Sequence, residues 1–175
     1  MQILAEIHHA EGINIQGKTV HRNAVRAVIL RGRELLMVYS ANVGDYKFPG
    51  GGVDRGESHQ QALVREVKEE CGMSLLQVGE EICRTVEYDL PMEREYDVFK
   101  MISYYYHCEV QDGFGPQKLD DYEVNLGFMP VWIDLVKAIE FNKVLLNSSA
   151  PPRWLEREVL VLEYIRGLIA ESSLD

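Results

Sequence analysis

The chain has 175 residues, of which 46% are hydrophobic and 26% charged, and its formal charge is −10 at pH 7. These proportions predict one soluble globular domain over residues 1–175, long enough to bury a core of its own. The acidic balance argues against long nucleic acid as a partner, because phosphate backbones are bound through basic patches. No apolar run reaches membrane-spanning length and the three cysteines lack C-x-x-C spacing, so we expect a cytoplasmic protein without a membrane partner.

The first 20 residues are expected to form a β arm in front of the main body of the domain, residues 21–146. The composition of residues 1–9 is typical of a strand, and Gly12 and Gly17 predict turns after it. This arm forms either a β-hairpin at a sheet edge or an element that joins two copies in a homodimer. The sequence does not decide between these interpretations.

Two strands rich in apolar side chains are predicted over residues 22–30 and 34–39, with a turn at Gly32. Arg22 and Arg26 lie four positions apart, so the two-residue period of a strand puts both side chains on one face. Their planar guanidinium groups match phosphate oxygens, which makes both arginines candidates for binding a phosphorylated ligand. The alternative is that both face solvent.

A glycine-rich turn leads into the best-defined helix of the sequence. Gly50, Gly51 and Gly52 allow the backbone to approach a ligand closely and to adopt dihedral angles that other residues avoid. Ser58 is the expected N-cap, because its hydroxyl can accept an unpaired amide proton of the first turn. Gly72 is the expected end of the helix, since glycine enters the left-handed conformation at little cost.

The last two turns of this helix carry Glu66, Glu69 and Glu70. Their spacing of three and four residues projects all three carboxylates from one helix face. Like charges at this spacing repel each other, and a single neighbouring Arg65 does not balance them. An acidic cluster of this kind is usually a solvated surface, and the alternative is a site for a hard divalent cation.

The second half of the chain contains further strands and two helices. Strands are predicted within residues 75–90 and 98–110, followed by a loop rich in glycine and proline and then another strand. One helix is expected to start after the N-cap Asp134 and to run to Phe141, and a C-terminal helix lies within residues 151–170. Because the order does not follow a regular βαβ alternation, it predicts an α+β fold.

The glycine turn and its helix resemble the signature of the Nudix hydrolase family, G-x5-E-x7-R-E-U-x-E-E-x-G-U, in which U is a bulky aliphatic residue. The fixed and U positions are filled by Gly51, Glu57, Arg65, Glu66, Val67, Glu69, Glu70, Gly72 and Met73. A match this long is specific, unlike a lone short glycine motif. The resemblance implies an α/β/α sandwich around a mixed β-sheet, to which the N-terminal β-hairpin would be added.

The resemblance also implies a hydrolase that cleaves a diphosphate linkage in a nucleoside diphosphate derivative with Mg²⁺, or with Mn²⁺. In this interpretation the metal ligands are Glu66, Glu69 and Glu70, and the carbonyl of Gly51 completes the set. A divalent cation would neutralise the diphosphate and acidify the attacking water. Carboxylates on one helix hold such a cation without relying on a mobile loop.

The family likeness assigns supporting roles to residues around the glutamates. Arg65 is expected to pair with Glu57 and so to hold the turn in register with the helix. Gly50 and Gly52 are expected to lie against substrate, and Tyr46, in a lead-in that is similar to that of the family, is a candidate to stack on a base.

The general base is not fixed by the motif. It is Glu66, Glu69 or a carboxylate from a later loop, for which Glu123 is the best candidate, with Asp120 and Asp121 behind it. A solvated acidic turn is the alternative for these three later residues.

The substrate class is left open by the same residues. The absence of a coenzyme A or ADP-ribose extension to the motif favours a nucleoside triphosphate, and the alternative is ADP-ribose or a nucleotide sugar. A different class of function is a non-catalytic sensor that binds nucleotides with this fold, against which the complete glutamate set argues. An isomerase of the same fold is disfavoured, because Cys71 lies on the apolar side of the helix.

Overall fold

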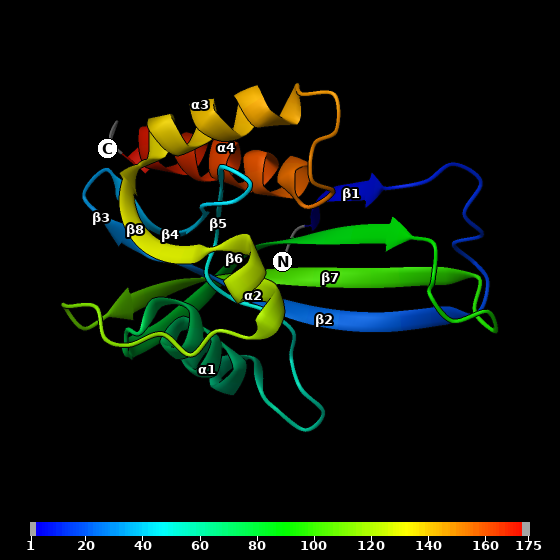
Figure 1. The fold of residues 1–175 in the computed structure, drawn as a ribbon, viewed down its shortest axis with the longest axis horizontal. Helices are drawn as coiled ribbons and strands as arrows, with labels where there is room; N and C mark the ends of the chain where they lie inside the picture. Colours follow the sequence, from blue (N-terminus) through cyan, green and yellow to red (C-terminus); the bar gives the residue numbers. More distant parts are fainter. Residues whose placement is uncertain (1–2, 173–175) are drawn as a thin grey trace.

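Two four-stranded sheets form the centre of the molecule in the computed structural model, which describes residues 3–172 (Figure 1). In the first sheet the outer strands run parallel to their neighbours and the inner two run antiparallel, so the sheet is mixed. In spatial order its strands are β1 (Ile3–His8), β6 (Leu75–Asp89), β7 (Val98–Val110) and β2 (Thr19–Val28).

The second sheet is antiparallel and is built around one strand, β4 (Glu34–Ser40). Its other strands, all paired with β4, are β3 (Leu30–Arg31), β5 (Asp45–Lys47) and β8 (Phe128–Asp134). The apolar run at the centre of β4 predicted a strand covered on both faces, and the fold confirms it.

Helices cover the sheets on both outer sides. The four helices are α1 (His59–Cys71), α2 (Asp121–Leu126), α3 (Leu135–Leu146) and α4 (Leu155–Ser172). Helix α1 lies on one side, and α3 and α4 lie next to each other on the other side (Figure 1). The expected α+β sandwich with a mixed sheet is thus confirmed, although its strands are divided between two sheets. No helix within residues 3–172 is long and apolar enough to cross a membrane.

The side chains of β4 join the two halves of the core. Leu36 and Val38 pack in the cluster that includes α1, whereas Leu35 and Met37 pack in the cluster that includes α3 and α4. All four are fully buried, and burying a side chain of this size contributes about 1.5 to 3 kcal/mol. The strand is therefore anchored from both sides.

The expected N-terminal hairpin is not formed. Strand β1 pairs with β6 and β2 pairs with β7, so the first two strands lie at opposite edges of the same sheet. The reason is that β6 and β7 form a long hairpin of their own, whose edges offer pairing to both strands. Met1 and Gln2, which belonged to the predicted strand, lie outside the described residues.

Helix α2 occurs where the sequence predicted a loop leading directly into a strand. Asp120 caps it, because its carboxylate accepts the N–H of Glu123 at 2.8 Å while the Glu123 carboxylate accepts the N–H of Asp120 at 2.8 Å. This reciprocal pair is a capping box, and an acid three residues after an N-cap residue was the signal for it. The predicted caps Ser58, Gly72 and Asp134 are confirmed, and α3 runs beyond Phe141 to Leu146.

Candidate active site

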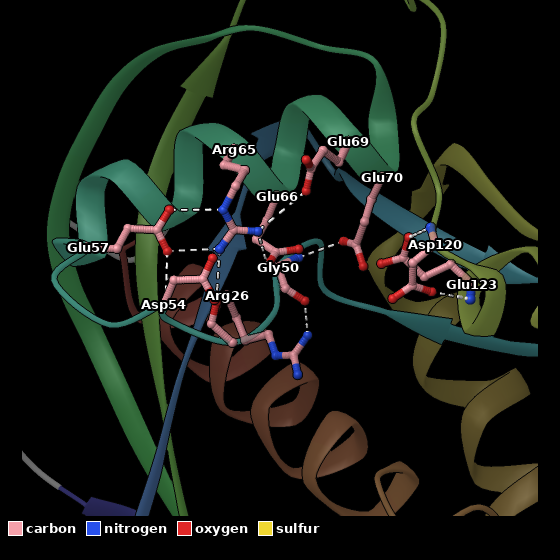
Figure 2. Close-up of polar contacts among 11 residues, drawn as sticks. Arg26, Gly50, Asp54, Glu57, Arg65, Glu66, Glu69, Glu70, Asp120 and Glu123 are labelled. Carbon is pink, nitrogen blue, oxygen red and sulfur yellow. Dashed lines mark hydrogen bonds and ion pairs between the residues drawn. The ribbon is translucent and has the colours of Figure 1, made fainter.

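Helix α1 is fixed at both ends and along one face. The Ser58 hydroxyl and the Gln61 amide form a capping box at its start, and Gly72 takes the left-handed conformation, with φ 66°, at its end. Leu63 and Val67 are fully buried and attach the helix to the sheets. On the adjoining face, the carboxylates of Glu66 and Glu70 are directed toward the glycine turn (Figure 2).

Three carboxylates from two helices meet beside this turn. Oxygens of Glu66, Glu70 and Glu123 lie within 4.8 Å of one another. Burial raises the pKa of Glu66 and of Glu123, and it raises the pKa of Glu70 to about 8. The arrangement therefore concentrates oxygen ligands where their negative charge is poorly hydrated.

Glu69 stands apart from this group. Its carboxylate lies 3.3 Å from Nη1 of Arg65, and its side chain is 30% exposed. The sequence suggested Glu66, Glu69 and Glu70 as the metal ligands, whereas the structure gathers Glu66 and Glu70 with Glu123. Helical spacing placed the three motif glutamates on one face, but the packing of α2 against β8 brings in the third carboxylate.

Arg65 links the helix to the turn, as expected (Figure 2). Its guanidinium donates to both carboxylate oxygens of Glu57, at 2.9 and 2.8 Å, and to the carbonyl of Gly52 at 3.0 Å. It also donates to Glu66 at 2.7 Å. The hydrogen bonds from Arg65 lower the pKa of Glu57 to about 2, so this pair stays charged and keeps the turn in register with the helix.

The glycine turn is held against both β2 and the glutamates. The N–H of Gly50 donates to Glu70 at 2.7 Å, and its carbonyl accepts from Arg26. The carbonyl of Gly51, which the sequence suggested as a metal ligand, accepts the N–H of Val25 at 2.9 Å. The carbonyls of Gly50 and Gly52 therefore accept from charged side chains, Arg26 and Arg65, whereas that of Gly51 pairs with β2.

A pocket of about 570 Å³ opens beside these groups. Arg22 and Arg26 both line it, which confirms that they share one face of β2, and Gly50, Gly51 and Gly52 form its floor together with the glutamates. Within the described residues, Nε of Arg26 has no hydrogen-bond partner. Two cations therefore line the same pocket as the carboxylate cluster.

Tyr46 is not brought to this pocket. Its ring packs on Tyr39, at 5.0 Å between ring centroids, and on Phe141 at 5.9 Å. Successive side chains of β5 point to opposite faces, so Tyr46 turns toward α3 and the next residue, Lys47, lines the pocket instead. The lead-in pattern alone could not reveal which of the two faces the pocket.

Part of the pocket is lined by aromatic rings, which the sequence analysis did not predict. Lys47 lies over the rings of Phe128 and Trp154, at 4.2 and 4.5 Å from their centroids, and 5.8 Å from that of Tyr122. Burial lowers the pKa of Lys47, and the negative charges of Asp45 and other carboxylates oppose that effect. These residues come from β5, α2, β8 and the start of α4, so only the tertiary fold assembles them.

Comparison with known proteins gives the same assignment as the motif. The family model described as NUDIX domain matches residues 20–147, well over half of the chain. The chain is 36% identical over 80 residues to an RNA pyrophosphohydrolase of a Nitratiruptor species, covering 42% of this chain and 52% of that one. It is 41% identical over 73 residues to an RNA pyrophosphohydrolase of Erythrobacter litoralis, covering 38% and 44%. The matches thus span about half the length of these curated relatives.

Solved structures share the fold at low sequence identity. The solution structure of the E. coli ORF135 protein has a TM-score of 0.59 and 22% identity, and the match covers 90% of this chain and 96% of that one. The structure of a NUDIX hydrolase from Nitrosomonas europaea has a TM-score of 0.56 and 19% identity, and the match covers 85% of this chain and 90% of that one. These likenesses establish the architecture of the chain.

Proposed function

Because the chain belongs to the NUDIX domain family, we propose that it is a hydrolase that cleaves a diphosphate linkage in a nucleoside diphosphate derivative with the help of a divalent cation. The observation that carries this proposal is the group of three carboxylates within 4.8 Å, which shares one pocket with two arginines. Hydrolysis of a diphosphate needs positive charge on the phosphates and an activated water, for which the arginines and a cation held by the carboxylates would serve.

The donor set fits a hard cation such as Mg²⁺ or Mn²⁺. Glu66, Glu70 and Glu123 would hold it through carboxylate oxygens. A bound cation would neutralise phosphate charge and lower the pKa of a coordinated water. Buried carboxylates without such a cation repel one another, which is a reason for the raised pKa values in this group.

The remaining polar groups have roles that need no metal. Arg22 and Arg26 would bind the phosphates and hold the reacting phosphorus near the carboxylates. Glu69, outside the three-carboxylate group and partly exposed, is our candidate to accept the proton of the attacking water. Arg65 would act through its partners, by holding Glu57, Glu66 and the carbonyl of Gly52 in place.

A phosphate-release screen tests the activity. The protein would be incubated with excess Mg²⁺ and with nucleoside triphosphates, oxidised nucleotides, nucleotide sugars, ADP-ribose, dinucleoside polyphosphates and coenzyme A, with pyrophosphatase and phosphatase coupled to the products. We expect turnover of at least one substrate, favouring the triphosphates, that stops when EDTA is added. A folded protein that binds Mg²⁺ and nucleotide but hydrolyses nothing would instead be a nucleotide sensor.

A second candidate substrate follows from the relatives, which are named RNA pyrophosphohydrolases. An RNA whose 5′ end carries a triphosphate contains the same diphosphate linkage, and only its terminal nucleotide would need to enter the pocket. The chain carries a formal charge of −10, which disfavours tracking along an RNA backbone. Including a short triphosphorylated RNA in the screen distinguishes the two, because the favoured substrate has the higher kcat/KM.

Binding of Mg²⁺ is expected to release about one proton at pH 7 and to strengthen as the pH rises toward 8. Burial raises the pKa of Glu70 to about 8, so at pH 7 this carboxyl is mostly protonated, and it must ionise before it can hold a cation. For the same reason, the metal-free protein should lose stability between pH about 4.5 and 8, since the folded state binds this proton more tightly than the unfolded state. Calorimetric titration in buffers of different ionisation enthalpy measures the released proton. A release that persists in Glu70→Gln would assign it to another group.

A further inference from the structure

Lys47 is a largely buried lysine whose ammonium group has no hydrogen-bonded partner among the described residues. Its exposed fraction is 8%, and its side chain lines the same pocket as the glutamates. Among residues 3–172, no hydrogen-bond acceptor and no carboxylate lies within bonding distance of its Nζ atom. An ammonium group carries three N–H donors, so this one is suited to a ligand that brings an acceptor into the pocket.

The charges around Lys47 favour a neutral acceptor over a further anion. Asp45 already accepts from Nε1 of Trp154 at 2.6 Å, and Glu158 accepts from Arg157 at 2.9 Å. Arg157 also pairs with Glu87, at 2.6 Å, so the carboxylates around Lys47 and Arg157 leave no excess positive charge in this part of the pocket. Arg22 and Arg26, to which the proposed function assigns the phosphates, lie on β2.

Aromatic side chains surround Lys47 in the pocket. Trp154 and Tyr122 both line the pocket, and Tyr122 is 53% exposed although it belongs to the wall of a cavity. An exposed aromatic face of this kind stacks on nucleobases of any sequence. Tyr122 also precedes Glu123 on α2, which links the aromatic wall directly to the carboxylate group.

We propose that Lys47 is a specificity-determining residue that selects a nucleobase presenting a keto oxygen over one presenting an amino group at the same position. A lysine donates to the keto oxygen and, in a 6-keto purine, also to N7 on the same edge of the base, whereas an exocyclic amino group offers it a donor where it needs an acceptor. The inference rests on the proposed function for the orientation of the substrate, with its phosphates at the arginines and its base at Lys47.

The test compares bases that differ at one group. Binding of IMP against AMP, and of UMP against CMP, would be measured by NMR or calorimetric titration, and kcat/KM would be measured for the matching triphosphates. The variants are Lys47→Met, which keeps length but removes the donors, and Lys47→Gln, whose amide suits the amino and ring nitrogen groups of adenine. Lys137→Met, an exposed change on α3, is the matched control.

We expect the wild type and the control to favour the keto base by roughly 10- to 100-fold in at least one pair. Lys47→Met should reduce this preference to within about threefold without weakening the binding of AMP. Lys47→Gln should shift the preference toward adenine. Equal binding of both members in both pairs, or a preference that survives in Lys47→Met, would overturn the inference. Monophosphates contain no diphosphate linkage, so a Lys47-dependent preference in binding without any turnover would contradict the proposed activity and leave this inference standing.

Discussion

Glu70→Gln is expected to reduce kcat by about 10³-fold or more while the protein keeps its fold and its melting temperature. Glu70 offers one of the three clustered carboxylates, and an amide lacks the charge that holds a hard cation. Metal stabilisation of phosphoryl chemistry amounts to several kcal/mol, and each 1.36 kcal/mol is tenfold in rate. Steady-state turnover with saturating Mg²⁺ and the best substrate of the screen measures the effect.

The stability of this variant is the informative part of the prediction. Burial keeps Glu70 largely protonated near neutral pH in the metal-free protein, and glutamine is close in shape to a protonated glutamate. Its amide oxygen can still accept the N–H of Gly50. Thermal unfolding without metal should therefore be unchanged or slightly raised, whereas stabilisation by Mg²⁺ should be lost.

Glu156→Gln provides the control, since Glu156 is an exposed glutamate in the first turn of α4. It should leave turnover and Mg²⁺ binding unchanged. Turnover of Glu70→Gln within tenfold of the wild type would remove Glu70 from the metal site and with it the central part of the proposed function.

Local interactions explain what could be predicted from the sequence. The caps of α1 depend on residues close in the chain, whose spacing fixes their geometry. The pairing of Arg65 with Glu57 was expected from the family likeness. The shared face of Arg22 and Arg26 depends only on the strand period. These features required no knowledge of which elements pack together.

Long-range packing explains what could not be predicted. Glu123 reaches Glu66 and Glu70 because α2 packs beside β8, and no periodicity encodes that approach. Lys47 lines the pocket in place of the expected Tyr46 because the face of β5 that carries Tyr46 meets α3. The opposite-edge positions of β1 and β2 likewise depend on the hairpin of β6 and β7, which is formed far along the chain.

Gly50→Ala is expected to destabilise the fold by roughly 3 to 5 kcal/mol and to lower turnover by about 10²-fold or more at temperatures where the variant is still folded. A Cβ atom at this position would lie 2.1 Å from the carbonyl oxygen of Val25, at a φ of +136° that side chains rarely adopt. The turn must move to relieve the clash, and the movement would withdraw the N–H of Gly50 from Glu70 and its carbonyl from Arg26.

Gly56→Ala separates backbone strain from this clash. Gly56 has a φ of +85°, but a Cβ atom there meets nothing within 4 Å. That variant should lose only about 1 to 2 kcal/mol, the usual cost of the left-handed conformation, and should keep its turnover. Chemical denaturation and turnover would be measured for both variants. If both lost the same stability and both stayed active, close contact between the glycine turn and β2 would not be what holds Glu70 in position. The hydrogen bonds of Arg65 and the buried face of α1 would then be what keeps the helix against the turn.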